Sequence, residues 1–459
     1  MSANRHDGAL VRFKPYPAYK NSGVDWLGEI PAHWQVKKWR YCCYVTEGQV
    51  APDDDRYRDR IMIAPNHIES GTGRILFTET ADEQGAISGK YLVKPGDLIY
   101  SKIRPALNKV CIAAGDWLCS ADMYPVKVTA SDLRARYLLY FILSEPFVRL
   151  MVDESMRVAM PKVNREKLAA CPLLIPAPSE QDAIAAFLDR ETAKTDALVA
   201  KKERVIELLQ EKRTALITQA VTRGLDPNVP MRDSGIEWLG EIPAHWCVKK
   251  LKEVSSLQTG LTLGKRYEAG QLEVRPYLRV ANVQDGYLDL DDIAEIELPL
   301  QEARRYELRV GDVLMTEGGD FDKLGRGHVW DGQIHGCLHQ NHIFAVRPIH
   351  AEVHPRFLAA IMGSGYGRAY FTATSKQSTN LASTSSTKLR NLPVPLPPAG
   401  EQEGILRFVA ATAGELALMV RRIEDGVDRL KEFRNALISA AVTGKIDVRT
   451  DLDAEELQA

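Results

Sequence analysis

The chain contains one long segment twice. Residues 22–38 read SGVDWLGEIPAHWQVKK, and residues 234–250 read SGIEWLGEIPAHWCVKK. The shared Trp-Leu-Gly-Glu-Ile-Pro-Ala-His-Trp motif begins at Trp26 and again at Trp238, 212 positions later. Solenoid repeats have periods of about 20–50 residues, so a period this long indicates that whole domains are duplicated. A chain of 459 residues is also long enough for about two to four domains.

A second repeated element closes each half of the chain. The segment IPAPSEQ at 175–181 resembles LPPAGEQ at 396–402, and an Ala-Val-Thr triplet follows each of them. Glu180 and Glu401 are 221 positions apart, and the two triplets keep the same offset, so the intervening segments have equal length. Their apolar residues recur at spacings of three, four and seven. This pattern predicts long helices with a coiled-coil-like seam over 180–222 and 401–443.

Each predicted helix has roughly 43 residues and a length of about 64 Å at about 1.5 Å per residue. The equal lengths favour packing of the two helices against each other. The simpler alternative is that each helix packs only on its own domain.

Two variable regions, roughly 36–170 and 248–392, lie between the repeated elements. Short alternating apolar runs predict strands, and Gly-Asp pairs at 96–97 and 311–312 mark equivalent turns into a strand. The predicted fold class is α+β, with two globular domains, two long helices and an internal twofold repeat. The expected parts are an N-terminal repeated element (1–35), a first variable domain (36–175), a first long helix (176–224), a second repeated element (225–247), a second variable domain (248–395), a second long helix (396–444) and an acidic tail (445–459).

Charge and cysteine usage restrict the class of protein. The formal net charge is −2, so any surface for a nucleic acid must be a local patch. The seven cysteines are dispersed, with no Cys-x-x-Cys pair, which fits reduced thiols. No stretch approaches the ~20 apolar residues of a membrane span, and residues 1–20 lack the apolar run of a signal peptide. We therefore expect a cytoplasmic protein.

This layout resembles the specificity subunit of type I restriction–modification systems. The resemblance covers nearly the whole chain and is specific because several segments carry it together. They are the Trp-Leu-Gly-Glu-Ile-Pro-Ala-His-Trp segments at 26–34 and 238–246, the Pro-rich helix starts at 176–181 and 397–402, the run AVTGKIDV at 441–448 and the stretch VGDVLMTEGGDFDKLG at 310–325.

The resemblance implies a non-catalytic subunit that binds double-stranded DNA sequence-specifically. In this family two target-recognition domains each read one half of a split site, and the two helices form an antiparallel coiled coil that sets the distance between the halves. Modification subunits, of which we expect two, methylate adenines, and restriction subunits add ATP-driven translocation and cleavage. The resemblance implies no cofactor in this chain, whereas the partner subunits are expected to use S-adenosylmethionine, ATP and Mg²⁺.

Side chains that read DNA bases are Arg, Lys, Asn, Gln, Ser and Thr, whereas phosphates attract cations and backbone N–H groups. Polar, basic segments in both variable domains supply such residues. In the first domain the candidates are Lys102, Arg104, Asn108, Lys109, Arg157, Lys162, Asn164 and Arg165. In the second domain they are Lys323, Arg326, Gln340, Asn341, Lys376, Gln377 and Asn380. The alternative for each is a solvated loop residue without a contact.

The repeated tryptophans, Trp26, Trp34, Trp238 and Trp246, are candidates for base stacking. We expect them instead to pack against the helices or a partner subunit. The two copies of the motif are alike, whereas the two halves of a split site differ.

Sequence motifs of the common catalytic classes are missing. The sequence has no Walker motif of the type G-x-x-x-x-G-K-[ST], no Asn-Pro-Pro-Tyr-like run and no G-x-S-x-G elbow, so we expect no catalytic residues. The run HGCLHQNH, from His335 to His342, leaves open a metal-dependent hydrolase. On a strand, however, His335, Cys337 and His339 would share one face, with His342 on the other. A third alternative is a coiled-coil adaptor, which would gain nothing from two unlike domains.

Overall fold

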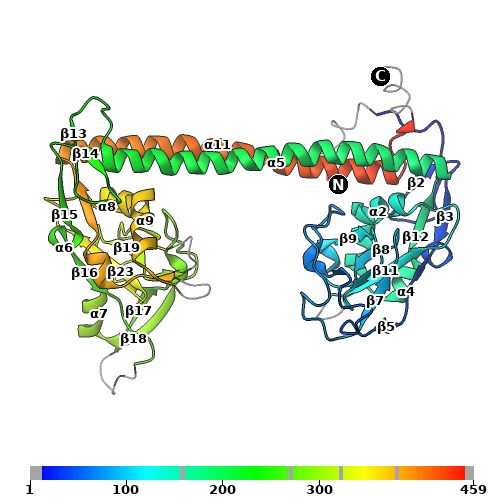
Figure 1. The fold of residues 1–459 in the computed structure, drawn as a ribbon, viewed down its shortest axis with the longest axis horizontal. Helices are drawn as coiled ribbons and strands as arrows, with labels where there is room; N and C mark the ends of the chain where they lie inside the picture. The colour runs from blue at the N-terminus through cyan, green and yellow to red at the C-terminus, as the bar shows by residue number, and fades with distance from the viewer. Residues whose placement is uncertain are drawn as a thin grey trace. The chain divides into compact units, whose positions relative to one another are not determined.

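The computed structural model describes residues 13–155, 161–265, 267, 272–319, 324–377 and 382–449. The chain divides into two compact units. Unit 1 consists of the residues up to Glu203 together with those from Glu424 onward, and unit 2 consists of Arg204–Ile423. Both units mix helices and sheets, as the alternating and helical patterns predicted (Figure 1).

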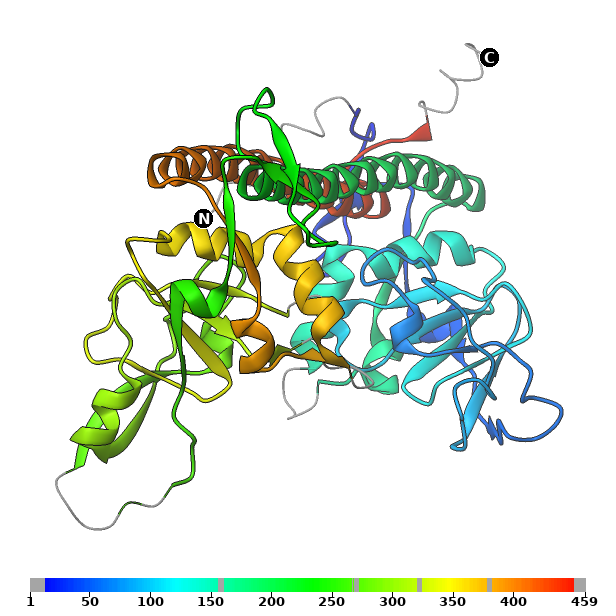
Figure 2. The same ribbon diagram turned by 60° about the vertical axis from the view of Figure 1, so that its left-hand side comes forward.

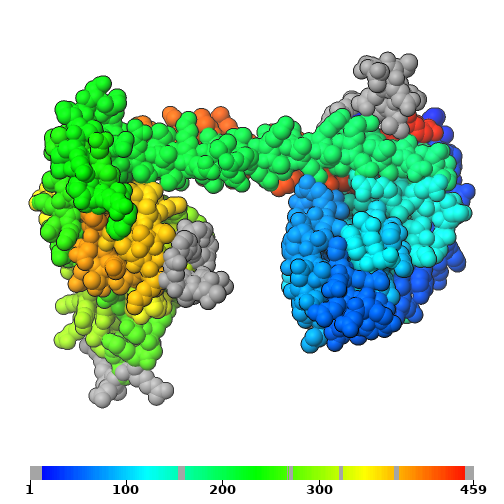
Figure 3. All heavy atoms as spheres, viewed as in Figure 1, coloured from blue at the N-terminus to red at the C-terminus, as the bar shows by residue number. Residues whose placement is uncertain are grey.

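Two long helices form where the repeat spacing predicted them. Helix α5 spans Pro178–Arg223, with 46 residues, and helix α11 spans Ala399–Val442, with 44 residues. Gly224 and Gly444 follow them with φ of 76° and 72°. Glycine adopts this left-handed conformation without the steric penalty of a Cβ, so it is well suited to end a helix. Side chains of α5 are visible on the surface along the helix (Figure 3). No described helix is long and apolar enough to cross a membrane.

The described residues of unit 1 form two four-stranded sheets, in the orders β4-β11-β8-β9 and β5-β7-β10-β6, and the pairs β1-β2 and β12-β3. The strands are β1 (Tyr19–Asn21), β2 (Glu29–Pro31), β3 (Gln35–Lys38), β4 (Cys43–Val45), β5 (Gln49–Val50), β6 (Met62–Ile63), β7 (Lys90–Val93), β8 (Leu98–Ser101), β9 (Val110–Ile112), β10 (Trp117–Cys119), β11 (Met123–Val128) and β12 (Pro172–Ile175). The register of the first sheet places Leu98 opposite both Val126 and Ile112, which are apolar, so this sheet contributes to the core.

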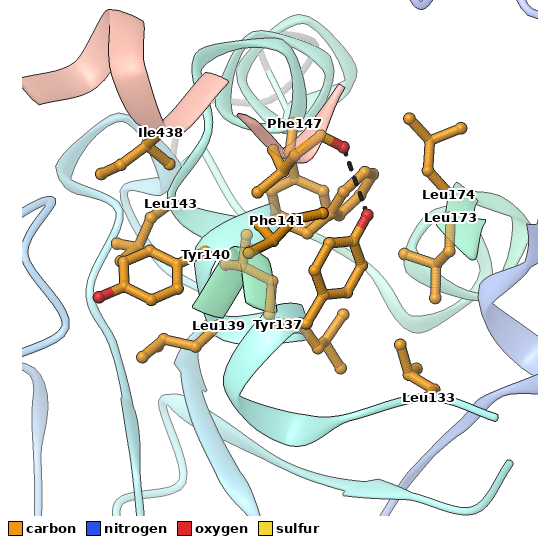
Figure 4. Close-up of a cluster of buried hydrophobic side chains, with 14 of the residues drawn as sticks. Leu133, Tyr137, Leu139, Tyr140, Phe141, Leu143, Phe147, Leu173, Leu174 and Ile438 are labelled. Carbon is orange, nitrogen blue, oxygen red and sulfur yellow. Dashed lines mark hydrogen bonds between the residues drawn. The ribbon is translucent and has the colours of Figure 1, made fainter. Parts of the chain in front are cut away.

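Helix α2 (Ala135–Leu143) fills the core of unit 1. Seven of its nine residues are buried, in keeping with its nearly continuous apolar sequence. Tyr137 and Phe141 pack in one cluster with Phe147, Leu173 and Ile438 (Figure 4). The other helical segments are η1 (Trp39–Tyr41), η2 (Pro65–His67), η3 (Pro105–Leu107), α3 (Glu145–Ser155) and α4 (Arg165–Ala170).

The described residues of unit 2 form a four-stranded sheet, β16-β23-β19-β21, two three-stranded sheets, β18-β17-β22 and β20-β25-β24, and the pairs β13-β14 and β15-β26. The strands are β13 (Met231–Asp233), β14 (Glu241–Pro243), β15 (Cys247–Lys250), β16 (Ser255–Thr259), β17 (Leu272–Leu278), β18 (Ala294–Pro299), β19 (Val313–Thr316), β20 (Gly318–Gly319), β21 (Gly327–Val329), β22 (Leu338–His339), β23 (Ile343–Pro348), β24 (Lys376–Gln377), β25 (Ala382–Ser383) and β26 (Pro393–Leu396).

In unit 2, helices α8 (Pro355–Gly363) and α9 (Gly365–Thr374) lie between the sheet β16-β23-β19-β21 and the long helices (Figure 2). The backbone N–H of Gly365 donates to the hydroxyl of Thr218 on α5 at 2.8 Å. The remaining helical segments are α6 (Leu251–Val254), η4 (Val280–Asn282), α7 (Leu300–Tyr306) and α10 (Ser386–Arg390).

The two variable regions share one sheet plan although their sequences differ. The order β4-β11-β8-β9 in unit 1 corresponds to β16-β23-β19-β21 in unit 2, and both sheets are antiparallel. The predicted turns into a strand are confirmed, because Gly96 and Gly311 have φ of 87° and 90° and lead into β8 and β19. A common backbone therefore carries two different sets of side chains.

The repeated His-Trp pair binds the glutamate at the start of each long helix. In unit 1 the indole Nε1 of Trp34 donates to Glu180 at 3.0 Å, and His33 Nε2 lies 2.8 Å from the same carboxylate. In unit 2 Trp246 and His245 contact Glu401 in the same way, at 3.1 and 2.9 Å. Trp34 and Trp246 are buried, as expected of residues that pack on the helices, whereas Trp26 is half-buried and Trp238 is 48% exposed.

The glutamine after each of these glutamates fixes the adjacent loop. Gln181 Nε2 donates to the carbonyls of Asp132 and Pro176 at 2.7 and 2.8 Å, and its Oε1 accepts from the N–H of Arg134 at 2.8 Å. Gln402 makes the equivalent three bonds in unit 2. The repeated Glu-Gln pair thus joins a long helix to the domain beside it.

Candidate nucleic-acid interface

In unit 1 the structure joins the two predicted DNA-binding segments. Ile103 and Lys162 form an antiparallel bridge, and the N–H of Arg104 donates to the carbonyl of Pro161 at 3.1 Å. The N–H of Val163 donates to the carbonyl of Lys102 at 2.8 Å. Ile103 and Lys162 are 59 positions apart in the sequence, yet the segments that contain them form one polar edge beyond the end of β8.

Four cationic side chains gather at this edge. Lys102 and Arg165 lie over the ring of Tyr124, at 5.6 and 5.7 Å from its centroid, and Arg104 and Lys162 are exposed. Burial, and then the positive charge of Lys162, lower the pKa of Lys102. Arg165 is also paired with Glu47, so Lys102, Arg104 and Lys162 are the cations that favour a polyanion here, although the chain as a whole carries a small negative charge.

The other polar candidates in unit 1 have structural hydrogen bonds. Asn108 is buried, and its Nδ2 donates to the carbonyl of Ile142 at 3.0 Å. Lys109 Nζ donates to the carbonyl of Pro65 at 2.7 Å, and Asn164 Oδ1 accepts from the backbone N–H of Lys167 at 2.7 Å. Asn164 is thus the N-cap of α4, where a side-chain oxygen replaces a missing helical bond. Arg157 lies outside the described residues.

In unit 2 the candidates lie on several elements, and of the described ones Lys376 and Gln377 belong to the small sheet β20-β25-β24 that follows β19. Lys376 is exposed on β24, and Arg326 Nη1 donates to Gln284 Oε1 at 3.1 Å. Gln340 and Asn341 are half-buried, and their backbone N–H groups donate to the carbonyls of Leu278 and Leu261. Lys323 and Asn380 lie outside the described residues, and only the backbone of Gln377 lies within them.

The polar edges of the two units have the same backbone hydrogen bonds. In unit 1 the N–H of Lys102 donates to the carbonyl of Asp122 at 3.0 Å, while its carbonyl accepts from Val163. In unit 2 the N–H of Glu317 donates to the carbonyl of His342 at 2.9 Å, and its carbonyl accepts from Thr384 at 2.9 Å. Lys102 and Glu317 therefore occupy equivalent positions.

The caps of the following helices are also equivalent. Asn164 caps α4, and Ser385, 221 positions later, caps α10 by accepting from the backbone N–H of Lys388.

Glu317 is a polar residue that sequence reasoning missed. Its carboxylate Oε2 lies 2.8 Å from Nδ1 of His342. The sequence does contain a signal for Glu317, because this residue follows a Gly-Asp turn and a strand and lies 215 positions after Lys102.

The histidine-rich run does not form the long strand that alternation suggested, because only Leu338–His339 are in strand β22. His339 is buried, and its Nδ1 lies 2.9 Å from the carbonyl of Ile343, while Cys337 is buried beside it. His342 instead contacts Glu317. In the described part of the chain, no group of three or more His, Cys, Asp or Glu residues could hold a metal ion.

Comparison with known proteins gives a consistent result. Residues 61–208 match the family model of the type I restriction modification DNA specificity domain. The chain is 31% identical over 258 residues to the type I restriction enzyme EcoDI specificity subunit of Escherichia coli, a match that covers 55% of this chain and 53% of that protein. It is 24% identical to the putative type I restriction enzyme MjaX specificity subunit of Methanocaldococcus jannaschii, over 40% of this chain and 44% of that one. The chain thus spans about half the length of these relatives.

The fold also has a solved counterpart. A chain in a structure that concerns complex assembly and conformational transition of the type I R-M system matches with a TM-score of 0.61 and 19% identity. The match covers 91% of this chain and 99% of that one, so the likeness extends over both units.

Proposed function

We propose that the chain is the DNA-reading, non-catalytic specificity subunit of a type I restriction–modification complex, because residues 61–208 match the family model of the type I restriction modification DNA specificity domain and the chain is similar to specificity subunits of type I restriction enzymes. One observation carries the proposal. The two units present polar edges with the same backbone frame, at Lys102 and Glu317, but with different side chains. This arrangement suits a split target, in which two readers are placed alike and recognise different bases.

The long helices are proposed to act as the spacer between the two readers. In unit 1 the first part of α5 contacts the last part of α11, through Asp196 and Arg434. In unit 2 the last part of α5, at Ala220 and Val221, shares a cluster with Ile405 near the start of α11. These contacts support an antiparallel coiled coil that sets an unread gap, with half-site centres about one helical turn, roughly 34–36 Å, or a little more apart.

The partners follow from this assignment. We propose that modification subunits, two per complex, bind this chain and methylate adenines with S-adenosylmethionine, and that restriction subunits use ATP and Mg²⁺ for translocation and cleavage in the cytoplasm. Binding to double-stranded DNA by the complex is then expected to weaken with salt, with a log–log slope of about −0.9 for each phosphate neutralised.

The test is co-expression of the full chain with its cognate modification subunits in a host without other adenine methyltransferases, followed by mapping of N6-methyladenine. The expected result is one split motif with a fixed gap. Replacing residues 36–170 with the corresponding region of a relative is expected to change one half of the motif and preserve the other. Absence of any methylated motif from an assembled complex would overturn the proposal.

The spacer is tested by lengthening both helices together. Seven residues inserted near the middle of α5 and of α11 add about 10.5 Å at 1.5 Å per residue and preserve the heptad pattern. At about 3.4 Å per base pair, the gap should grow by about three base pairs while both halves of the motif stay the same. The matched control inserts the same seven residues into α5 alone, which disturbs the pairing of the helices and should abolish methylation. An unchanged gap in the double insertion contradicts the spacer role.

A further inference from the structure

Lys102 and Glu317 occupy one structural position in the two units and carry opposite charges. Each is the first residue after the strand that a Gly-Asp turn introduces, β8 in unit 1 and β19 in unit 2. Each also donates its backbone N–H and offers its backbone carbonyl to equivalent partners. The backbone therefore orients the two side chains in the same way. One of them carries a positive charge and the other a negative charge.

Intramolecular contacts orient each of these side chains and leave part of its hydrogen-bonding capacity unused. The ammonium of Lys102 donates to the carbonyl of Ala121 and lies over the ring of Tyr124, so two of its three N–H donors remain. The carboxylate of Glu317 accepts from His342 at Oε2, so its other oxygen remains. The two side chains are half-buried and stay accessible in part. Such orientation reduces the entropy that is lost when a side chain contacts a ligand.

A carboxylate on a DNA-facing edge is unfavourable unless it accepts a hydrogen bond from a base, because phosphates repel it. In the major groove, glutamate accepts from the N4 amino group of cytosine, and lysine donates to O6 and N7 of guanine. Lys376, which is exposed on β24 in the small sheet that begins directly after Glu317, would hold a phosphate while Glu317 reads the base. A carboxylate at the place of a lysine thus indicates a change in the base that is read.

We propose that this shared position reads one base pair in each half-site, with Lys102 donating to a guanine and Glu317 accepting from a cytosine. The inference rests on the proposed function and names two of its specificity-determining residues.

The experiment uses the full chain in complex with its cognate modification subunits and compares methylated motifs of Glu317→Gln and Lys102→Gln with the unsubstituted complex. A glutamine amide both donates and accepts, so it discriminates less between the bases. For Glu317→Gln we expect discrimination at one base pair of one half-site to fall by about tenfold, within the range of about 5-fold to 150-fold for loss of one specific contact. Lys102→Gln should act on one base pair of the other half-site. Glu297→Gln, an exposed residue of β18 in the same unit as Glu317, is the matched control and should leave the motif unchanged.

The outcomes separate this inference from the proposed function. If the unsubstituted complex yields no split motif, the proposed function fails. If it yields the motif, and both substitutions leave every position as selective as before, the inference alone is overturned. An even loss of methylation at all sites would mean that Glu317 supports the fold, which also overturns it. His342→Ala is a second variant, which keeps the carboxylate of Glu317 but removes its orienting partner. It should lower discrimination between bases at the same base pair as Glu317→Gln. Lower discrimination at a different base pair would contradict the inference.

Discussion

Arg434 of α11 and Asp196 of α5 form a nearly buried ion pair in unit 1, with 2.9 Å between Nε and Oδ1. The other guanidinium nitrogens of Arg434 donate to the carbonyls of Gly71 and Thr72, at 3.0 and 3.3 Å. One side chain therefore joins both long helices to a loop of the first variable region. The residue 221 positions earlier, Arg213, is exposed in unit 2, and among the described residues it makes no ion pair. This joint is thus a feature of unit 1 that the repeat does not reproduce.

Arg434→Ala is expected to lower the free energy of unfolding by about 3–5 kcal/mol, because it leaves the Asp196 carboxylate without its partner in a poorly hydrated site. Urea denaturation followed by circular dichroism measures the change. Arg213→Ala is the matched control and should change the free energy of unfolding by less than about 0.5 kcal/mol. Equal effects of the two substitutions would show that the ion pair contributes little.

The glutamates at the starts of the long helices should differ in their contribution to stability. Glu180 accepts hydrogen bonds from Trp34 and also from the hydroxyl of Tyr16, at 2.7 Å, and it is 5% exposed. Glu180→Ala leaves two buried donors unpaired, so we expect a loss of about 2–5 kcal/mol. Glu401 is 30% exposed, and Glu401→Ala is expected to cost about 1–2 kcal/mol. Thermal unfolding of both variants tests the order, and a larger loss for Glu401→Ala contradicts this account.

We expect His339 to make the stability of unit 2 depend on pH. Burial lowers the pKa of its imidazole to about 4, whereas the pKa in the unfolded chain is about 6.5. Between these values the unfolded state binds a proton that the folded state does not bind. The free energy of unfolding is therefore fully retained above about pH 6.5 and decreases as the pH falls towards 4, by about 3 kcal/mol in total.

The measurement is urea denaturation at a series of pH values from 7 to 4 for the unsubstituted chain and for His339→Gln. Since glutamine does not titrate, the substitution is expected to remove about 3 kcal/mol of the difference between the two ends of this range. A pH dependence of the same size in both proteins would show that His339 does not cause it.

Lys162 is expected to contact phosphate rather than a base, because it is exposed at the bridge between the two polar segments of unit 1. Lys162→Gln in the assembled complex should weaken binding to all DNA sequences alike and reduce the log–log salt slope by about 0.9. Fluorescence anisotropy at several salt concentrations measures the slope. Lys127→Gln, which removes an exposed lysine from β11, serves as the control with an unchanged slope. A changed motif together with an unchanged slope would assign Lys162 to base reading instead.

The organisation along the chain was determined by the sequence itself. The repeated Glu-Gln and Ala-Val-Thr segments located both long helices. They could do so because helical periodicity and the glycine that ends a helix are local properties of the sequence. The Gly-Asp turns likewise located β8 and β19. The expected packing holds for the second tryptophan of each copy, Trp34 and Trp246, but not for Trp238, which is exposed.

The make-up of the polar edge was decided by tertiary structure. Lys102 and Lys162 meet through a bridge between distant segments, and no local pattern encodes such a pairing. Asn108 and Asn164 have the same polar chemistry as residues that read bases, yet burial of one and the N-cap position of the other engage their side chains in hydrogen bonds within the protein. Glu317 was missed because the residue types expected to read bases did not include carboxylates, although its position after the Gly-Asp turn matches that of Lys102. Which side chains stay available for a ligand depends on where the backbone carries them, and long-range packing sets that.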